Sequence, residues 1–144
     1  MRIIPDSARQ LIKEFEGLRL VAYPDAGGLL TIGYGHAINV KPNQTITLEQ
    51  ANAYVNEDMQ EAAKAIDSLV TVSLTDNEYA ALIDFVFNMG YRNFKNSTLL
   101  RLLNKGMYDQ IPQQLMRWNM VNGLEYGGLT RRRKAEAELW KSRS

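Results

Sequence analysis

The sequence predicts an α+β fold in which the strands are confined to one early segment. Residues 18–38 combine β-branched and aromatic residues with a glycine-rich turn, a composition typical of a hairpin. Helical periodicity precedes this segment and returns after it, and strands and helices do not alternate as they do in parallel α/β folds. The chain has 144 residues, 45% of them apolar, which is enough for one buried core. We therefore expect one domain over residues 1–144.

The composition excludes several kinds of site. There is no cysteine, so a disulfide framework and a thiolate metal centre are both impossible. His36 is the only histidine, which argues against a zinc site built on imidazoles. Seventeen basic and sixteen acidic residues leave the chain almost neutral. We therefore expect no metal and no other cofactor, and catalysis has to rely on the protein's own side chains.

The first element is predicted to be a helix that ends at Gly17. Asp6 or Ser7 can cap its beginning, with Ile4 placed as a hydrophobic staple. Glycine is common just after a helix because it tolerates a left-handed backbone. The apolar side chains recur at helical spacing on one face, at Ala8, Leu11, Ile12 and Phe15.

The segment 18–38 is predicted to form two strands, "RLVAY" and "LLTIGYGHAI", joined by the turn "PDAGG". Alternation along the second strand places Thr31, Gly33 and Gly35 on one face. Two glycines weaken a strand and often mark a place where a ligand approaches the backbone, so we predict a shallow groove beside the Thr31 hydroxyl. The opposite face is interpreted as packing surface, and His36 there as a structural, hydrogen-bonding histidine rather than a base.

Helical signals dominate the rest of the chain. Thr47 and Gln50 have the capping-box form and open a long helix that runs to about Leu69. Thr75 and Glu78 repeat this form and open "YAALIDFVFNMG", which is apolar on nearly every side and is therefore predicted to be a buried central helix. The glycine-rich "NGLEYGGL" can shape a loop near a cleft or simply separate two helices, and we favour the second. Shorter helices are expected near 97–104, 108–118 and 130–141.

One dense basic run, "RRRK" at 131–134, stands out from the otherwise even distribution of charge. The simplest interpretation is a solvated helix face. The alternative is attraction to an anionic surface outside the protein. No aromatic residues are interleaved with these charges and no nucleic-acid-binding motif accompanies them, so we expect no nucleic acid partner.

Three carboxylates, Glu14, Glu16 and Asp25, raise the question of an acid–base pair. The two glutamates flank the apolar face of the first helix on opposite sides, so periodicity does not choose between them. Glu16 directly precedes Gly17, where the negative end of the helix dipole disfavours the ionised form, and a general acid has to hold its proton. Asp25 lies in the turn, where aspartate is common because it bonds nearby backbone N–H groups. Ordinary surface charge is the alternative for each.

These groups together favour hydrolysis of a polar polymer without a cofactor. Glycoside hydrolysis needs two carboxyl groups, one to donate a proton and one to activate water or to stabilise positive charge. The spacing of Glu16, eight residues, Asp25, five residues and Thr31, with "GLRL" and "TIGYGH" as flanks, resembles the catalytic signature of the phage-type lysozymes, glycoside hydrolase family 24. The resemblance continues through "ALIDFVFNMG" at 81–90, "FKNSTLLRLLN" at 94–104 and "GLTRRRKAEAELW" at 128–140.

The resemblance implies a lysozyme-like fold and the activity of an endolysin. A small N-terminal lobe with the hairpin would be joined by the long helix to a larger helical lobe, with the cleft between them. The enzyme would hydrolyse the β-1,4 bond between N-acetylmuramic acid and N-acetylglucosamine in bacterial peptidoglycan and so lyse the host cell. Family behaviour implies inversion at the anomeric carbon, a property that depends on a carboxylate separation invisible in the sequence.

The resemblance also implies residue roles. Glu16 would protonate the leaving oxygen, Asp25 would activate water or stabilise the transition state, and Thr31 would position that water or Asp25. Asn88 would bond an N-acetyl group or a hydroxyl, whereas apolar contact with the sugar and ordinary core packing are equally good interpretations of Phe87. The full set of expected substrate-binding residues is Gly33 and Gly35, from the predicted groove, and Phe87, Asn88 and Ser97, from the resemblance.

The expected place of action follows from the N-terminus and from the resemblance. Ile3 and Ile4 form an apolar pair that Pro5 ends, too short for a signal peptide or a membrane span. We therefore expect a monomer made in the host cytoplasm, without stable membrane insertion, which reaches the cell wall after a holin-type partner has permeabilised the membrane; the alternative is a fragment whose targeting segment is absent. Two alternatives stay open: a catalytically silent peptidoglycan-binding protein on the same scaffold, and a glycosidase directed at chitin or chitosan.

Overall fold

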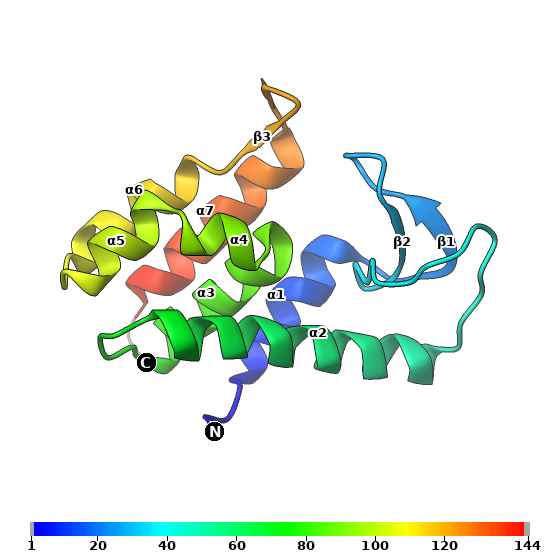
Figure 1. The fold of residues 1–144 in the computed structure, drawn as a ribbon, viewed down its shortest axis with the longest axis horizontal. Coiled ribbons are helices and arrows are strands. Elements are labelled where there is room, and N and C mark those ends of the chain that lie inside the picture. The colour runs from blue at the N-terminus through cyan, green and yellow to red at the C-terminus, as the bar shows by residue number, and fades with distance from the viewer. Residues whose placement is uncertain (1, 143–144) are drawn as a thin grey trace.

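The long helix α2 (Leu48–Leu69) determines the arrangement of the whole molecule. In the computed structural model, which describes residues 2–142, the β-hairpin lies near one end of α2 and the other helices gather around its second half (Figure 1). Thr47 accepts a hydrogen bond from the Gln50 backbone, and Gln50 returns one to the Thr47 backbone, so the predicted capping box is confirmed. The predicted α+β arrangement, with early strands and a helical remainder, is confirmed as well.

Helix α1 (Asp6–Glu16) begins one residue earlier than predicted. Its N-cap is Pro5, which makes no side-chain capping bond, so the prediction that Asp6 or Ser7 caps the helix is wrong. The proline already has the extended backbone that a capping position needs, with φ −62° and ψ 144°, and Asp6 forms an ion pair with Arg9 at 3.0 Å. Gly17 ends the helix at φ 67°, as predicted.

The hairpin pairs β1 (Arg19–Pro24) with β2 (Leu30–Gly33) in antiparallel register, so that Tyr23 lies opposite Thr31. Strand β2 is shorter than predicted and ends at Gly33. Gly33 and Gly35 have positive φ angles of 67° and 76°, which turn the chain back so that the Ile32 and His36 backbones bond each other. The predicted alternation of faces therefore does not extend to Gly35.

Helix α3 (Asp76–Met89) is the buried centre of the helical part, as predicted. The reciprocal capping box of Thr75 and Glu78 starts it, and Gly90 ends it at φ 89°. Its middle is buried on every side. Helices α1, α2 and α7 (Gly127–Lys141) pack against it. The consecutive buried residues are Tyr79, Ala80, Ala81, Leu82, Ile83, Asp84, Phe85 and Val86.

Short elements connect the central helix to α7. The glycine-rich segment before α7 forms a small hairpin, in which Asn122 and Gly123 take positive φ angles of 52° and 81°. Among residues 2–142, no helix combines the length and the apolar character needed to cross a membrane. The short elements, in chain order, are α4 (Tyr91–Lys95), α5 (Thr98–Asn104), η1 (Tyr108–Gln110), α6 (Ile111–Met116), β3 (Met120–Val121) and β4 (Leu124–Glu125).

Candidate active site

Glu16 is the last residue of α1, and its side chain is 17% exposed. The loop after β2 passes directly against it. A Cβ atom built on Gly35 would lie 2.5 Å from both Cδ and Oε1 of Glu16. No larger residue fits at this position unless the loop or the carboxyl group moves. Glu14, by contrast, is exposed on the same helix, in agreement with its interpretation as surface charge.

Asp25 lies in the turn between β1 and β2 and is exposed. Its Oδ1 atom accepts hydrogen bonds from the backbone N–H groups of Gly27, at 2.9 Å, and Leu29, at 2.8 Å. These bonds fix the side chain through one oxygen only, and Oδ2 takes no part in them. The turn thus fixes the Asp25 carboxylate through Oδ1 and makes no hydrogen bond to Oδ2.

Thr31 lies beside this turn and is buried, with 3% of its surface exposed. Its hydroxyl donates a hydrogen bond of 2.8 Å to the Leu29 carbonyl, the residue whose N–H bonds Asp25. A hydroxyl that donates one bond keeps its lone pairs as acceptors. The structure therefore brings Thr31 and Asp25 together through the backbone of Leu29.

Tyr23 lies within reach of the charges of both Glu16 and Asp25. Burial raises the pKa of the Tyr23 phenol, and the negative charges of Glu16 and of Asp25 raise it further, against the opposing charge of Arg19. The Arg19 guanidinium lies 4.4 Å from the centre of the Tyr23 ring. Sequence reasoning missed Tyr23. A prediction of the strand register would place Tyr23 opposite Thr31 and so beside the site.

Arg132 ties the acid to the helical part of the molecule. Its Nη1 lies 2.5 Å from Oε2 of Glu16, while Nη2 and Nε bond the two oxygens of Asp84 at 2.8 and 3.0 Å. Burial by itself lowers the pKa of Arg132, but the charges of Asp84 and Glu16 outweigh it and raise the pKa above its ordinary value. The guanidinium therefore stays charged, and it fixes Oε2 of Glu16 from one side.

The interpretation of the basic run as a solvated face, or as an attractor of outside anions, is wrong for two of its four residues. Arg132 and Arg133 are 4% and 0% exposed and bind carboxylates inside the protein. Arg133 also donates a hydrogen bond of 2.8 Å to Oδ1 of Asn88. Only Arg131 and Lys134 of this run are exposed.

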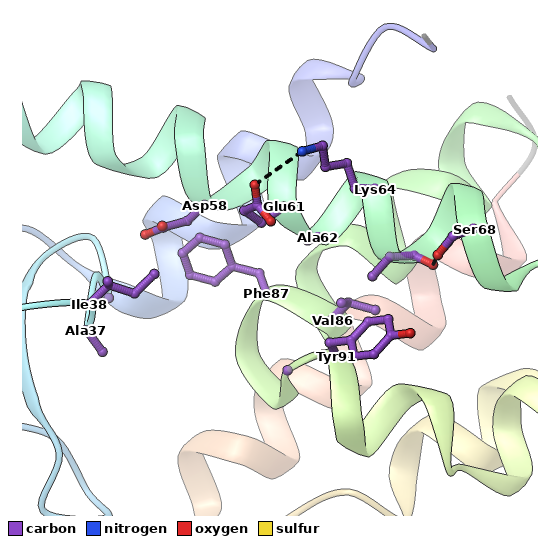
Figure 2. A pocket seen from close by; sticks show the side chains of 13 residues that line it. Ala37, Ile38, Asp58, Glu61, Ala62, Lys64, Ser68, Val86, Phe87 and Tyr91 are labelled. Carbon is purple, nitrogen blue, oxygen red and sulfur yellow. Dashed lines mark hydrogen bonds and ion pairs between the residues drawn. The ribbon is translucent and has the colours of Figure 1, made fainter.

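A cavity of about 470 Å³ lies along the loop after β2, and neither Glu16 nor Asp25 is among the described residues that line it. Gly35 lies in its wall and also against the Glu16 carboxyl group, so the acid and the cavity share this residue. Figure 2 shows Phe87 projecting from α3 into the space between α2 and the loop at Ala37 and Ile38. Tyr91 lines the cavity farther along, and half of its surface is exposed. Phe87 lines this wall and also packs against the hydrophobic core, so ligand contact and core packing both stay open as interpretations.

Two residues with an implied binding role have packing or capping contacts instead. A Cβ on Gly33 would lie 3.4 Å from Ile46 and 3.5 Å from Ala51, in the small apolar cluster behind the hairpin. Ser97 is buried at the start of α5, where its hydroxyl donates to the Phe94 carbonyl and accepts from the Leu100 N–H. The structure does not connect either residue to the carboxylates.

His36 makes structural contacts, in agreement with its interpretation from the sequence. Its Nδ1 atom lies 2.8 Å from Oδ2 of Asp58, and its ring stacks on Tyr54 with centroids 4.1 Å apart. Burial raises the pKa of the Asp58 carboxyl, against the lowering effect of the hydrogen bond and charge of His36. This pair joins the loop after β2 to α2 and so supports the wall that carries Gly35.

The chain matches the family model described as phage lysozyme over residues 13–136. The chain belongs to the phage lysozyme family. It is 41% identical over 143 residues to an endolysin of Acyrthosiphon pisum secondary endosymbiont phage 1, covering 96% of this chain and 98% of that one. It is 38% identical over 140 residues to an endolysin of Bacillus phage B103, covering 95% of this chain but 53% of that protein's length. The solved muramidase domain of SpmX from Asticaccaulis excentricus has a TM-score of 0.88 and 34% identity, covering 99% of this chain and all of that one.

Membership of the phage lysozyme family confirms three expectations drawn from the sequence. The fold is lysozyme-like, the protein is an enzyme of the lysozyme class, and its activity is that of a peptidoglycan-hydrolysing endolysin. The matches do not favour a silent binding protein or a chitin-directed glycosidase. The matches to this phage lysozyme assign no roles to individual residues.

Proposed function

We propose that this lysozyme cleaves the β-1,4 bond between N-acetylmuramic acid and N-acetylglucosamine, with Glu16 and Asp25 as its two carboxyl groups. The observation that carries the proposal is geometric: Arg132 holds the largely buried Glu16 carboxyl at the end of α1, and backbone N–H groups of the hairpin turn hold the Asp25 carboxylate. Glycoside hydrolysis needs two carboxyl groups that flank one scissile bond. Gly35 then connects the Glu16 carboxyl to the neighbouring cavity.

Glu16 is the general acid in this proposal. Its Oε2 atom is held by Arg132, so the catalytic proton belongs on Oε1, the oxygen that faces Gly35. From there it passes to the glycosidic oxygen as the bond to the anomeric carbon breaks. The carboxyl group is mostly buried, so little bulk water competes for this proton.

Asp25 acts on the sugar from the side opposite Glu16. The turn engages Oδ1, so Oδ2 is the oxygen that activates the attacking water or faces the positive charge of the transition state. Thr31 uses its hydroxyl hydrogen on the Leu29 carbonyl, and its lone pairs can accept a hydrogen bond from the same water. We expect inversion, which NMR detects as the α-anomer in the first product of a β-linked substrate. A β-anomer as the first product would contradict this role of Asp25.

The cavity next to Gly35 is the proposed site for the sugars that flank the scissile bond. Phe87 provides an apolar surface there for a pyranose ring or an acetyl methyl group. Asn88, one residue farther along α3, provides an amide for hydrogen bonding. Gly33 and Ser97 have no such support, because their surroundings are packing and capping contacts.

We propose that the lysozyme acts as a monomer and that residues 1–144 form one domain. The hairpin end and the helical end of the molecule would form the two lobes, joined by α2. The enzyme would be made in the host cytoplasm and reach the wall after a holin has opened the membrane. The names of the relatives, which are endolysins, support action on the cell wall during phage lysis.

Clearing of a suspension of purified cell walls tests the acid assignment. We expect Glu16→Gln, which keeps the shape but carries no transferable proton, to lower the clearing rate at least about 100-fold, the lower range of general acid catalysis. Glu14→Gln, on the exposed side of the same helix, is the matched control and should clear walls at the wild-type rate. Equal clearing by Glu16→Gln and wild type would show that the acid assignment is wrong.

A further inference from the structure

The acid–base chemistry leaves one buried ion pair of α7 unexplained. Arg133 and Glu136 are both 0% exposed, and Nη2 of Arg133 donates to Oε2 of Glu136 at 2.8 Å. The Arg133 Nε atom also lies 2.8 Å from Oε1 of Glu136, but it is poorly aligned for a hydrogen bond. Removing two charges from water is costly, and apolar residues of similar size are often no less stable in such a place. Stability alone therefore does not account for this pair.

Outside α7 the pair contacts Asp84, Phe85 and Asn88 of α3, and the contact with Asn88 fixes the orientation of an amide. Nη2 of Arg133 lies 2.8 Å from Oδ1 of Asn88, on the last turn of α3. A guanidinium has only donors, so the atom that faces it must be the amide oxygen of Asn88 and not the nitrogen. An asparagine has a donor and an acceptor end, and Arg133 binds the acceptor end from inside the protein. The NH₂ group of Asn88 is consequently directed away from the buried guanidinium.

This NH₂ group is available for a bond to another molecule. Asn88 is half-buried, and within residues 2–142 its Nδ2 atom has no hydrogen-bond acceptor. Its neighbours Phe87 and Gly90 line the 470 Å³ cavity (Figure 2). Arg132, next to Arg133 in α7, holds Glu16. The free donor is therefore on the last turn of α3. Phe87 and Gly90 beside it line the cavity, and α7, which packs on α3, holds Glu16 through Arg132.

We propose that Arg133, supported by Glu136, is a positioning residue that sets Asn88 as a hydrogen-bond donor to a carbonyl oxygen of the substrate. The N-acetyl carbonyl of a substrate sugar is the acceptor that this donor fits. If Asn88 were free to rotate, it would offer its own oxygen half of the time, and two carbonyl oxygens cannot bond each other. The inference rests on the proposed function, and it deepens that function by assigning the direction of one bond to the sugar.

The state of Glu136 guides the choice of variants. Burial first, and then the hydrogen bond and charge of Asp84, raise the pKa of the Glu136 carboxyl well above its ordinary range. Replacing Arg133 alone would leave a buried polar group without its partner, which is strongly destabilising. The double variant Arg133→Met/Glu136→Met removes both groups and keeps apolar volume. Asn88→Ala removes the donor directly, and Arg131→Met is the matched control, because Arg131 is the exposed neighbour in the same run.

The experiment measures binding without turnover. All variants are made in ¹⁵N-labelled Glu16→Gln protein, and a peptide-free tetrasaccharide of alternating N-acetylglucosamine and N-acetylmuramic acid is titrated while the side-chain amide signals are followed by NMR. We expect the Nδ2 signals of Asn88 to shift. We expect the Kd to rise about tenfold in Asn88→Ala and in the double variant, the effect of one lost hydrogen bond of ordinary strength. The Arg131→Met control should bind like the parent protein.

The triple variant decides whether Arg133 acts through Asn88. We expect Arg133→Met/Glu136→Met/Asn88→Ala to bind no more weakly than Asn88→Ala alone, because the pair then has nothing left to orient. Three outcomes would each overturn the inference. The first is that the effects of the double variant and of Asn88→Ala on the Kd multiply in the triple variant. The others are an unchanged Kd in the double variant and a parent protein that does not bind the tetrasaccharide. Failure of the proposed function is seen separately, as wild-type protein that does not clear cell walls. A melting curve of each variant shows that it is folded at the titration temperature.

Discussion

Gly35 illustrates how closely single residues are fitted around the acid. Its backbone has a φ of 76°, and the space that a side chain would take is occupied by the Glu16 carboxyl group. Gly33, two residues earlier, also has a positive φ, but its missing side chain faces Ile46 and Ala51. The sequence pointed to both glycines equally. It could not separate them, because the direction of each Cβ depends on backbone angles that a strict strand pattern does not include.

Replacing Gly35 by alanine should lower the activity of the enzyme by moving Glu16. The new Cβ would lie 2.5 Å from the carboxyl carbon, so we expect the rate of cell-wall clearing to fall at least about tenfold. Gly106→Ala is the matched control: its φ is 78°, with no atom within 4 Å of the new Cβ. Both variants should lose about 1–2 kcal/mol of stability to the left-handed backbone. Equal activity of the two variants, at equal folded fractions, would contradict the fit between Gly35 and Glu16.

At the scale of elements, the helix caps could be predicted from the sequence, whereas the contacts of α7 could not. The capping boxes that start α2 and α3 involve residues three positions apart, so local sequence was sufficient to place them. The partners of Arg132 lie 48 and 116 residues away, at Asp84 and Glu16. No local pattern reveals such partners, and four adjacent basic residues look like surface. The small hairpin before α7 is different, because its Asn-Gly turn is a local sequence signal for a hairpin.

The packing of α7 on α3 predicts a large cost for changing Asp84. Asp84 is fully buried and accepts two bonds from Arg132, and in Asp84→Asn the amide NH₂ would face one of these donors. We expect urea unfolding at pH 7 to show a loss of about 3 kcal/mol, typical of a broken buried ion pair. Glu138→Gln, in an exposed ion pair of 3.8 Å on the same helix, should cost less than about 1 kcal/mol. Similar losses in the two variants would contradict the role given to Asp84.

The pH dependence of unfolding gives a second test of Asp84. Burial alone would raise the pKa of this carboxyl, but the hydrogen bond of Glu136 and the charge and bonds of Arg132 lower it below the ordinary value of 3.8. The stabilisation is therefore fully present above pH 3.8 and is lost as the pH falls through the lower, folded-state value. Asp84→Asn should lack this acid-dependent part. If its stability falls with acid as steeply as that of the wild type, Asp84 is not the group responsible.

The proposed site combines segments of the molecule that are distant in the sequence. The end of α1 provides Glu16, the hairpin provides Asp25 and Thr31, and α7 provides the arginines that hold Glu16 and Asn88. Helix α2 spans both ends, and His36 joins it to the loop that carries Gly35 (Figure 1). The sequence predicted the general arrangement, because it follows from periodicity and the family pattern, and the assignment of the two catalytic carboxyl groups stays a prediction. It did not predict the arginine network, which exists only once α7 has packed on α3.

The most direct test of the whole account is the identity of the sugar left at the new reducing end. Purified peptidoglycan is digested with the enzyme, the products are reduced with borohydride, and the reduced sugars are identified by mass spectrometry. Cleavage between N-acetylmuramic acid and N-acetylglucosamine should give reduced N-acetylmuramic acid from the wild type and no new ends from Glu16→Gln. Reduced N-acetylglucosamine, or new ends from Glu16→Gln at the wild-type rate, would contradict the account.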